Sequence, residues 1–280
     1  MALRAAELAA RLLPRRVTLA AGSALGSLMR VAGVYRRVVA ANMAHVGLWG
    51  ADEQKRIVRR LYRNMGRYMV DFLRAEPGRV PHDFTRPDFA DRILARGKGV
   101  IAVIGHFGNW EVLATIFGTL VPSLHVVSMP MKNPLVENWL ARKRARTGVT
   151  EISKNKAVRR ILRALHDNSI VAVLIDQNAR HQGTLVPFLG KPASTIRTVA
   201  GLLHKTDCAI LLSYALLKDD GTYAVHVEEG RDLGVPRDDP EAFIDAYQRE
   251  HNEVLSRWIQ EHPDHWFGWF HRRYGGQIRY

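Results

Sequence analysis

The chain has 280 residues, of which 47% are hydrophobic and 24% charged, a balance that excludes wholesale disorder and predicts a protein with its own buried core. A single cysteine, Cys208, excludes an intramolecular disulfide. The 41 Lys and Arg residues outnumber the 27 Asp and Glu residues, which gives a formal charge of +14 at pH 7 and favours an acidic partner such as a nucleic acid, an anionic membrane surface or an acidic carrier protein.

Residues 1–76 have helical periodicity and few prolines, and they predict an N-terminal helical appendage. In its first segment Leu8, Leu12 and Leu13 share one side of a helix that also carries arginines. This pattern is typical of a helix that lies in a membrane interface, and equally of a surface helix packed on the domain by its leucines. The apolar run 17–29 is shorter than the roughly 20 residues that cross a bilayer, so we expect peripheral or weak membrane attachment.

A second unit is predicted for residues 77–280, after a break that prolines and a glycine mark. Short apolar runs alternate there with stretches of helical spacing, and the runs are GVIAVIG, LHVVSM, SIVAVLI and CAILLSYALL. This alternation predicts an α/β fold with a mixed, mostly parallel central sheet flanked by helices. The first and third runs are continuously apolar, which predicts central strands covered on both faces. Further on, TYAVHVEE predicts an added strand and PEAFIDAYQREHNEVLSRWIQEHP a long helix.

The stretch VIAVIGHFGNWEVLATIFG joins one predicted strand to the next helix. Gly108 permits an unusual backbone angle, and Asn109 is a good cap for a helix that begins at Trp110. His106 and Glu111 would point about 140° apart on a continuous helix, so they meet only if the chain turns between them. The expected turn places His106 at the carboxyl end of a parallel strand, where open α/β sheets bind ligands.

A histidine beside a carboxylate has an obvious chemical use. The carboxylate holds the imidazole in one tautomer and favours its protonated form, so His106 with Glu111 can take a proton from an alcohol as a general base. The alternative is that Glu111 only complements the dipole of the first helical turn while His106 caps the strand end. A zinc site is disfavoured because the H-E-x-x-H spacing is absent and Glu follows His by five residues.

The hexapeptide HFGNWE is an H-x-x-x-x-[D/E] motif, and with its G-N-W interior it resembles the bacterial lipid A biosynthesis acyltransferase family. Three further elements of that family follow in order, which are MKNPLVENWLARKRARTG, IDQNARHQGTLVPFLGKPAST and HPDHWFGWFHRRY. The matching positions before the C-terminal element are Asn133, Pro134, Arg144, Arg146, Gly148, Asp176, Gln177, Phe188, Gly190, Pro192 and Thr195. The resemblance extends from about residue 98 to about residue 274.

This resemblance implies a glycerolipid acyltransferase-like fold and transfer of a fatty acyl group from acyl carrier protein to a hydroxyl of a lipid A precursor. It implies His106 as the general base and Glu111 as the residue that orients the imidazole. Attack on the thioester is then direct, without a serine or cysteine nucleophile. No cofactor is expected beyond the co-substrate, which is acyl carrier protein or coenzyme A loaded with a fatty acid.

Further residues of the same elements are candidates for binding the substrates. Those for the polar groups are Asn109, Arg144, Arg146, Asp176 and Gln177, and those for the acyl chain are Phe107, Trp110 and Phe188. Taken alone, the two arginines read as a solvated helix face, Asp176 as a residue that closes its strand, and the aromatic residues as core. Trp258, Trp266 and Trp269 near the C terminus fit either a membrane interface or packing on the sheet.

Two other functions stay open at this point. One is an acyl-CoA-dependent acyltransferase that acts on another glycolipid, such as a phosphatidylinositol mannoside. The other is a non-enzymatic basic protein that binds membranes. Nucleic-acid binding is not expected, because the sequence has no C-x-x-C pair, RNP-like motif or recognisable helix-turn-helix. We expect a monomer at the cytoplasmic face of the inner membrane, with acyl carrier protein, a glycolipid acceptor and an anionic membrane surface as its partners.

Overall fold

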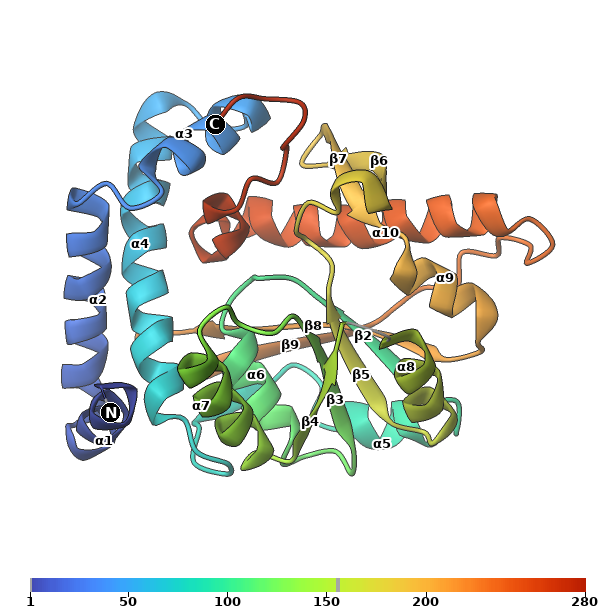
Figure 1. Cartoon of the computed structure of the whole chain (residues 1–280), viewed down its shortest axis with the longest axis horizontal. Coiled ribbons are helices and arrows are strands. Elements are labelled where there is room, and N and C mark those ends of the chain that lie inside the picture. Colours follow the sequence, from blue (N-terminus) through green and yellow to red (C-terminus); the bar gives the residue numbers. More distant parts are fainter. Residues whose placement is uncertain (1, 155–156) are drawn as a thin grey trace.

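The computed structural model describes residues 2–154 and 157–280 and has a seven-stranded sheet at its centre (Figure 1). The strand order is β1-β9-β8-β2-β5-β3-β4. The strands are β1 (His82–Phe84), β2 (Val100–Ile104), β3 (Leu124–Ser128), β4 (Val149–Ser153), β5 (Ile170–Leu174), β8 (Ala209–Leu217) and β9 (Tyr223–Glu229). Among the described residues of this seven-stranded sheet, only the β8–β9 pair is antiparallel. The predicted mixed, mostly parallel sheet is confirmed.

Helices pack around this sheet. They are α5 (Phe89–Leu94), α6 (Trp110–Phe117), α7 (Pro134–Ala145), α8 (Ala157–His166), α9 (Thr198–Lys205) and α10 (Pro240–Glu261). Every residue of β2 is buried, as its continuously apolar sequence predicted for a central strand covered on both faces. Long α10 runs across the top of the sheet in Figure 1, which corresponds to the predicted C-terminal helix.

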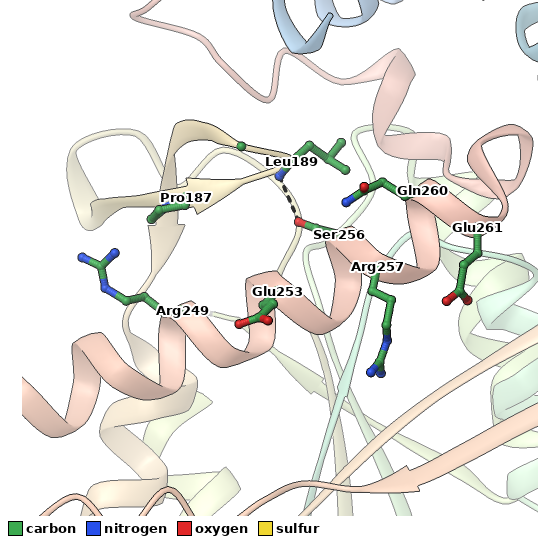
Figure 2. Close-up of a pocket in the computed structure, with 9 residues that line it drawn as sticks. Pro187, Leu189, Arg249, Glu253, Ser256, Arg257, Gln260 and Glu261 are labelled. Carbon is green, nitrogen blue, oxygen red and sulfur yellow. Dashed lines mark hydrogen bonds between the residues drawn. The ribbon is translucent and has the colours of Figure 1, made fainter. Parts of the chain in front are cut away.

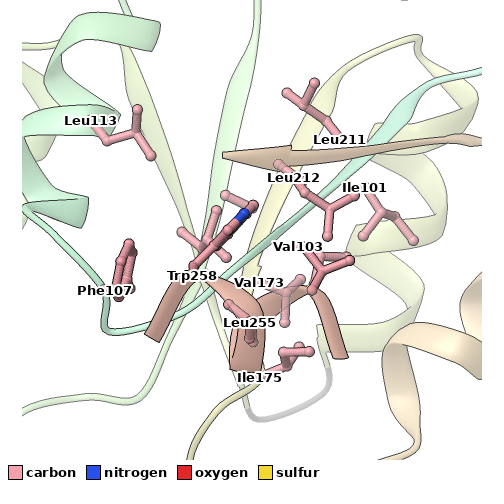
Figure 3. Close-up of a cluster of buried hydrophobic side chains, with 14 of the residues drawn as sticks. Ile101, Val103, Phe107, Leu113, Val173, Ile175, Leu211, Leu212, Leu255 and Trp258 are labelled. Carbon is pink, nitrogen blue, oxygen red and sulfur yellow. The ribbon is translucent and has the colours of Figure 1, made fainter. Parts of the chain in front are cut away.

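The core lies where α10 meets the central strands. Figure 3 shows Leu255 and Trp258 of α10 among side chains of β2, β5 and β8, including Val103, Val173 and Leu212. Trp258, Trp266 and Trp269 are all buried. The interpretation of the C-terminal tryptophans as membrane-interface residues is therefore wrong, because they are packed inside the domain.

A two-stranded ribbon stands apart from the main sheet. Strands β6 (Gly183–Phe188) and β7 (Lys191–Ile196) pair antiparallel and lie against α10. The turn residues Leu189 and Gly190 both have positive φ, 49° and 75°, as the tightest hairpin turns require. Sequence patterns did not predict this ribbon, although the G-x-x-V-P-F-x-G-x-P-A-x-T element coincides with it.

Four helices precede the sheet: α1 (Ala2–Leu12), α2 (Arg15–Val31), α3 (Arg36–Val46) and α4 (Ala51–Arg74). Helices α2 and α4 lie side by side in Figure 1 and touch at backbone level. A Cβ added to Gly22 would lie 2.6 Å from the carbonyl oxygen of Gly66, and one added to Gly26 would lie 1.9 Å from that of Tyr62. Only glycine permits so close an approach of the two backbones.

The three leucines that were expected to share one side of the first helix are exposed. Leu8, Leu12 and Leu13 have exposed fractions of 58%, 76% and 46%. The alternative in which these leucines attach α1 to the domain is therefore wrong. In the described part of the chain no single helix is both long enough and apolar enough to cross a bilayer, whereas α2 and α3 meet that test of length and composition only as a pair bent by 84°.

Candidate active site

The connection between β2 and α6 forms a tight turn that carries His106. Gly108 has a φ of 64°, and a Cβ at this position would lie 2.2 Å from the carbonyl oxygen of Ala215. The side chain of Asn109 accepts a hydrogen bond from the backbone N–H of Val112, 3.3 Å away, and α6 begins at Trp110. The turn, the glycine and the cap are as the sequence predicted. They place His106 just beyond the carboxyl end of β2.

Asp176 lies directly beside His106, because β5 is the neighbour of β2 in the sheet. Its Oδ1 is 2.8 Å from Nδ1 of His106, and its Oδ2 accepts the backbone N–H of the same histidine at 2.8 Å. The indole N–H of Trp266 donates to Oδ2 as well, at 2.7 Å. The strand-closing role that was considered for Asp176 is seen in its bond to the backbone N–H of His106, and the same carboxylate also contacts the imidazole.

The surroundings of Asp176 keep it ionised. Burial of this fully buried carboxyl raises its pKa, but the charge of His106 and the hydrogen bonds from His106 and Trp266 outweigh burial and lower the pKa to about 2. A carboxylate only accepts hydrogen bonds, so Nδ1 of His106 carries the hydrogen. The other ring nitrogen, Nε2, then has a lone pair.

The lone pair of Nε2 faces the side of His106 that solvent reaches. The His106 side chain retains 23% of its exposure, and the side-chain amide nitrogen of exposed Gln177 lies 3.3 Å from Nε2. The half-buried ring of Trp110 packs edge-on against the imidazole, with ring centroids 4.9 Å apart. The Gln177 amide therefore lies beside the ring nitrogen that an acceptor hydroxyl would approach.

Glu111 does not make the contact with the imidazole that was expected for it. Its carboxylate pairs with Arg144 of α7, with Oε1 2.5 Å from Nη2 and Oε2 3.2 Å from Nε. The remaining terminal nitrogen of Arg144 lies 3.0 Å from Oε1 of Glu151. The structure thus brings Asp176 to His106 and uses Glu111 to join α6 to α7. The reason is that the first turn of α6 points Glu111 toward the neighbouring helix rather than back toward the turn.

The other predicted binding residues are spread more widely. Arg146 ends α7 with a side chain that is 65% exposed and 3.9 Å from Glu7, so it is not brought to His106. Phe107 is buried against Tyr214 and Trp258. Phe188 of β6 is buried too and contacts Trp266. Of the three aromatic residues predicted for the acyl chain, only Trp110 contacts the imidazole.

Sequence reasoning missed the role of Arg273. This fully buried guanidinium donates to the backbone carbonyl of Gln177 at 3.3 Å, to that of Ser194, and to Oγ1 of Thr195 at 2.9 Å. Burial lowers its pKa to about 10. Arg273 therefore ties the loop after β5 to the β6–β7 ribbon. The H-R-R run was visible in the sequence, but nothing in its spacing indicated that one of its arginines is buried behind the site.

A chain of hydrogen bonds extends from the turn to the N-terminal helices. The side-chain amide of Asn109 donates to the hydroxyl of Tyr223 at 2.8 Å, and that hydroxyl donates to Asp71 at 2.7 Å. Arg15 of α2 binds both oxygens of Asp71, at 2.9 and 2.6 Å. Burial raises the pKa of Tyr223 well above its usual value, so its hydroxyl keeps its proton.

The start of α6 offers two more donors. The backbone N–H groups of Trp110 and Glu111 have no hydrogen-bond partner in the described part of the chain, as is usual for the first turn of a helix. These groups belong to the residues that follow the turn, on the same side of the sheet as His106. Within residues 2–154 and 157–280, no group of three or more His, Cys, Asp or Glu side chains could hold a metal ion.

A cavity of about 820 Å³ lies between α10 and the β6–β7 ribbon, and Figure 2 shows its lining. Leu189, Arg249 and Arg257 are among the residues around it. None of the residues that surround His106 lines this cavity. This cavity is therefore separate from the contact between His106 and Asp176.

The model of a family described as bacterial lipid A biosynthesis acyltransferase matches residues 3–275, nearly the whole chain. None of the curated proteins matches the sequence.

Proposed function

Because the chain belongs to the bacterial lipid A biosynthesis acyltransferase family and is therefore an acyltransferase, we propose that it moves a fatty acyl chain from acyl carrier protein to a hydroxyl of a lipid A precursor, with His106 as the general base. One observation carries the mechanism. The carboxylate of Asp176 fixes the hydrogen of His106 on Nδ1, which leaves the lone pair of Nε2 for the acceptor hydroxyl.

In this mechanism the acceptor oxygen attacks the carbonyl carbon of the thioester while Nε2 takes its proton. The new C–O bond forms, the C–S bond breaks, and the proton passes from the imidazolium to the departing thiolate. Asp176 stabilises the imidazolium that exists between these steps, because the two groups are in direct contact. A base of this kind contributes about 10²- to 10⁴-fold to the rate.

The developing negative charge on the thioester oxygen needs hydrogen-bond donors. The unpaired N–H groups of Trp110 and Glu111 at the start of α6 supply them in this proposal. Glu111 then acts through Arg144, since their two-point ion pair fixes the first turn of α6 against α7. The Gln177 amide leaves Nε2 when the acceptor hydroxyl arrives.

The partners in this proposal follow from charge and exposed apolar surface. Acyl carrier protein is acidic and suits a chain with a formal charge of +14. The exposed leucines of α1 beside its arginines support peripheral attachment to the cytoplasmic face of the inner membrane. We propose that the enzyme acts there as a monomer and needs no cofactor apart from the acyl donor.

An acyl-transfer assay tests the proposal directly. Purified protein is given acyl carrier protein loaded with a labelled fatty acid and a lipid A precursor, and the lipid product is identified by mass spectrometry. We expect a more highly acylated lipid, and a rate about 10²- to 10⁴-fold lower for His106→Ala. His166→Ala is the matched control, because this histidine lies on the surface at the end of α8.

Two outcomes would change the proposal in different ways. Near-normal turnover by His106→Ala would refute the general-base mechanism. If the wild-type protein makes no lipid A product but consumes acyl-CoA when a phosphatidylinositol mannoside is supplied, and His106→Ala does not, the base stands and both substrates are reassigned.

A further inference from the structure

A second cavity, of about 350 Å³, lies between α1, α4 and the segment that leads to β1. The charged residues that line it are Arg11, Arg15, Asp71, Arg74, Glu76 and Arg79. Four guanidinium groups and two carboxylates give this arginine cavity a formal charge of +2 (four minus two). Residues of the proposed acyl-transfer site do not line it. A cavity with such a charge in a protein wall attracts anions.

The internal pairing of the arginine cavity leaves donors unused. Each of the three guanidinium nitrogens of Arg15 makes a hydrogen bond, two to Asp71 and one to the carbonyl oxygen of Gly221. Arg74 differs, because its Nη1 donates only to the carbonyl oxygens of Ala10 and Leu13 and to Oγ1 of Thr18, at 3.0–3.2 Å. Neither its Nε nor its Nη2 has a hydrogen-bond partner among the described residues, and no described carboxylate lies within ion-pair distance of it.

Two other arginines of the cavity share one carboxylate. Glu76 is 3.0 Å from Arg11 and 3.3 Å from Arg79. Arg11 also binds Glu7, which is itself shared with Lys143 and Arg146 at 3.8 and 3.9 Å. The side chain of Arg79 is 81% exposed, so a ligand in solution can reach it. Positive charge is therefore in excess over carboxylates both in the cavity and in the groups that adjoin it.

Apolar surface adjoins the arginine cavity. Arg74 holds the carbonyl oxygen of Leu13, and the side chains of Leu12, Leu13 and Val17 around this point are exposed by 76%, 46% and 48%. A free inorganic anion has no apolar part that could contact such a surface. A molecule with an anionic head and an apolar tail matches both parts at once.

We propose that the arginine cavity is a binding site for the phosphate group of a membrane lipid, with the lipid chains lying along the exposed apolar side chains of α1 and α2. Guanidinium groups bind phosphate oxygens in pairs, and a phosphate monoester carries a charge of about −1.5 to −2 near pH 7. That charge balances the +2 of the cavity. The site is separate from the acyl-transfer site and its occupancy requires no acyl transfer.

Calorimetric titration of the full-length protein with soluble probes tests this site. The probes are dihexanoyl phosphatidate below its micelle concentration, inorganic phosphate, and dihexanoyl phosphatidylcholine, whose head has no net charge. We expect the phosphatidate to bind at least about tenfold more tightly than either of the others. Leu12→Ser should weaken the phosphatidate and leave inorganic phosphate unchanged.

Arginine variants locate the binding. Arg79→Gln alone, and the double variant with Arg74→Gln, should weaken the phosphatidate progressively, by about tenfold or more in the double variant. Arg79 makes a single described ion pair, so its variant should fold normally even if loss of Arg74 loosens α1. Arg86→Gln is the matched control, because Arg86 is exposed and no described side chain or backbone group binds its guanidinium.

Clear results would overturn the proposal. Equal affinity of the wild type and the folded double variant for phosphatidate would refute the site. If Arg86→Gln weakened binding as much as the cavity variants, binding would depend on the overall positive charge of the protein and not on this cavity. Inorganic phosphate bound as tightly as phosphatidate would show a site for free phosphate instead of a lipid. Because the readout is binding, the result stands whether or not acyl transfer to a lipid A precursor is observed.

Discussion

Replacing Asp176 by asparagine should move the hydrogen of His106 to the wrong nitrogen. Asp176 accepts three hydrogen bonds, two of them at Oδ2 from the backbone N–H of His106 and the indole of Trp266. Asparagine has only one oxygen. If that oxygen keeps the two donors at the Oδ2 position, the new NH₂ group meets Nδ1 and favours the tautomer with hydrogen on Nε2. A protonated Nε2 cannot take the proton of an acceptor hydroxyl.

The pKa of Asp176 gives the scale of the effect. It is lowered from 3.8 to about 2, which corresponds to a free energy on the order of 2–3 kcal/mol. The same free energy in the transition state is worth roughly 60-fold in rate. We therefore expect Asp176→Asn to lose between about 60-fold and the 10⁴-fold of a missing base. Because the folded pKa is lowered, the stabilisation is present above about pH 4 and is lost as pH falls toward 2.

Initial rates of thioester consumption at pH 7 measure this loss. Asp167→Asn is the control, because this aspartate is exposed and pairs only with its surface neighbours Arg163 and His166. Thermal melting shows whether each variant is folded. A folded Asp176→Asn enzyme within threefold of the wild-type rate would refute the tautomer argument. A second check is acid denaturation, in which the wild type should lose more stability than the variant between about pH 4 and pH 2.

Other variants probe the parts that surround His106, and salt probes the attachment. Glu111→Gln removes one carboxylate partner of Arg144 and should lower the free energy of unfolding by about 1–3 kcal/mol in a denaturant titration. An unchanged midpoint would mean that the ion pair does not contribute to stability. Gly108→Ala forces a Cβ to within 2.2 Å of a carbonyl oxygen at positive φ, so soluble, fully active protein from this variant would contradict the turn geometry. Arg273→Gln should reduce kcat by about tenfold or more through loss of its bond to the Gln177 carbonyl, and Arg272→Gln, its exposed neighbour, should not; equal effects would count against a positioning role. The proposed peripheral attachment predicts that high salt, which screens charge, releases much of the protein from isolated membranes, as assayed by sedimentation. Release only by detergent would contradict this.

The parts of the site that depend on neighbouring residues were predictable from the sequence. Gly108 and Asn109 have local reasons for their positions, one a backbone angle and the other a helix cap, and both were predicted correctly. The meeting of His106 and Asp176 was predictable on one condition, that their strands are neighbours. Periodicity identifies strands but does not give their order in a sheet, so the sequence left that condition open.

The parts that depend on distant residues were not predictable. The partner of Glu111 is set by where α7 crosses α6, and the partners of Asp176 and Gln177 include Trp266 and Arg273, about 90 residues further along the chain. A buried arginine and an exposed arginine look alike in an H-R-R run. Their difference arises only when the C-terminal segment folds back over the β6–β7 ribbon.

The contact between α2 and α4 also limits what protein engineering can do with this enzyme. Gly22 and Gly26 lie one helical turn apart on α2 and pack directly against the backbone of Gly66 and Tyr62 on α4. A side chain at either glycine would prevent this close packing. A chimera that carries a foreign helix in place of α2 will lack this match unless the new helix has glycines with the same spacing of four. When N-terminal helices are exchanged between relatives, α2 and α4 should therefore come from the same protein.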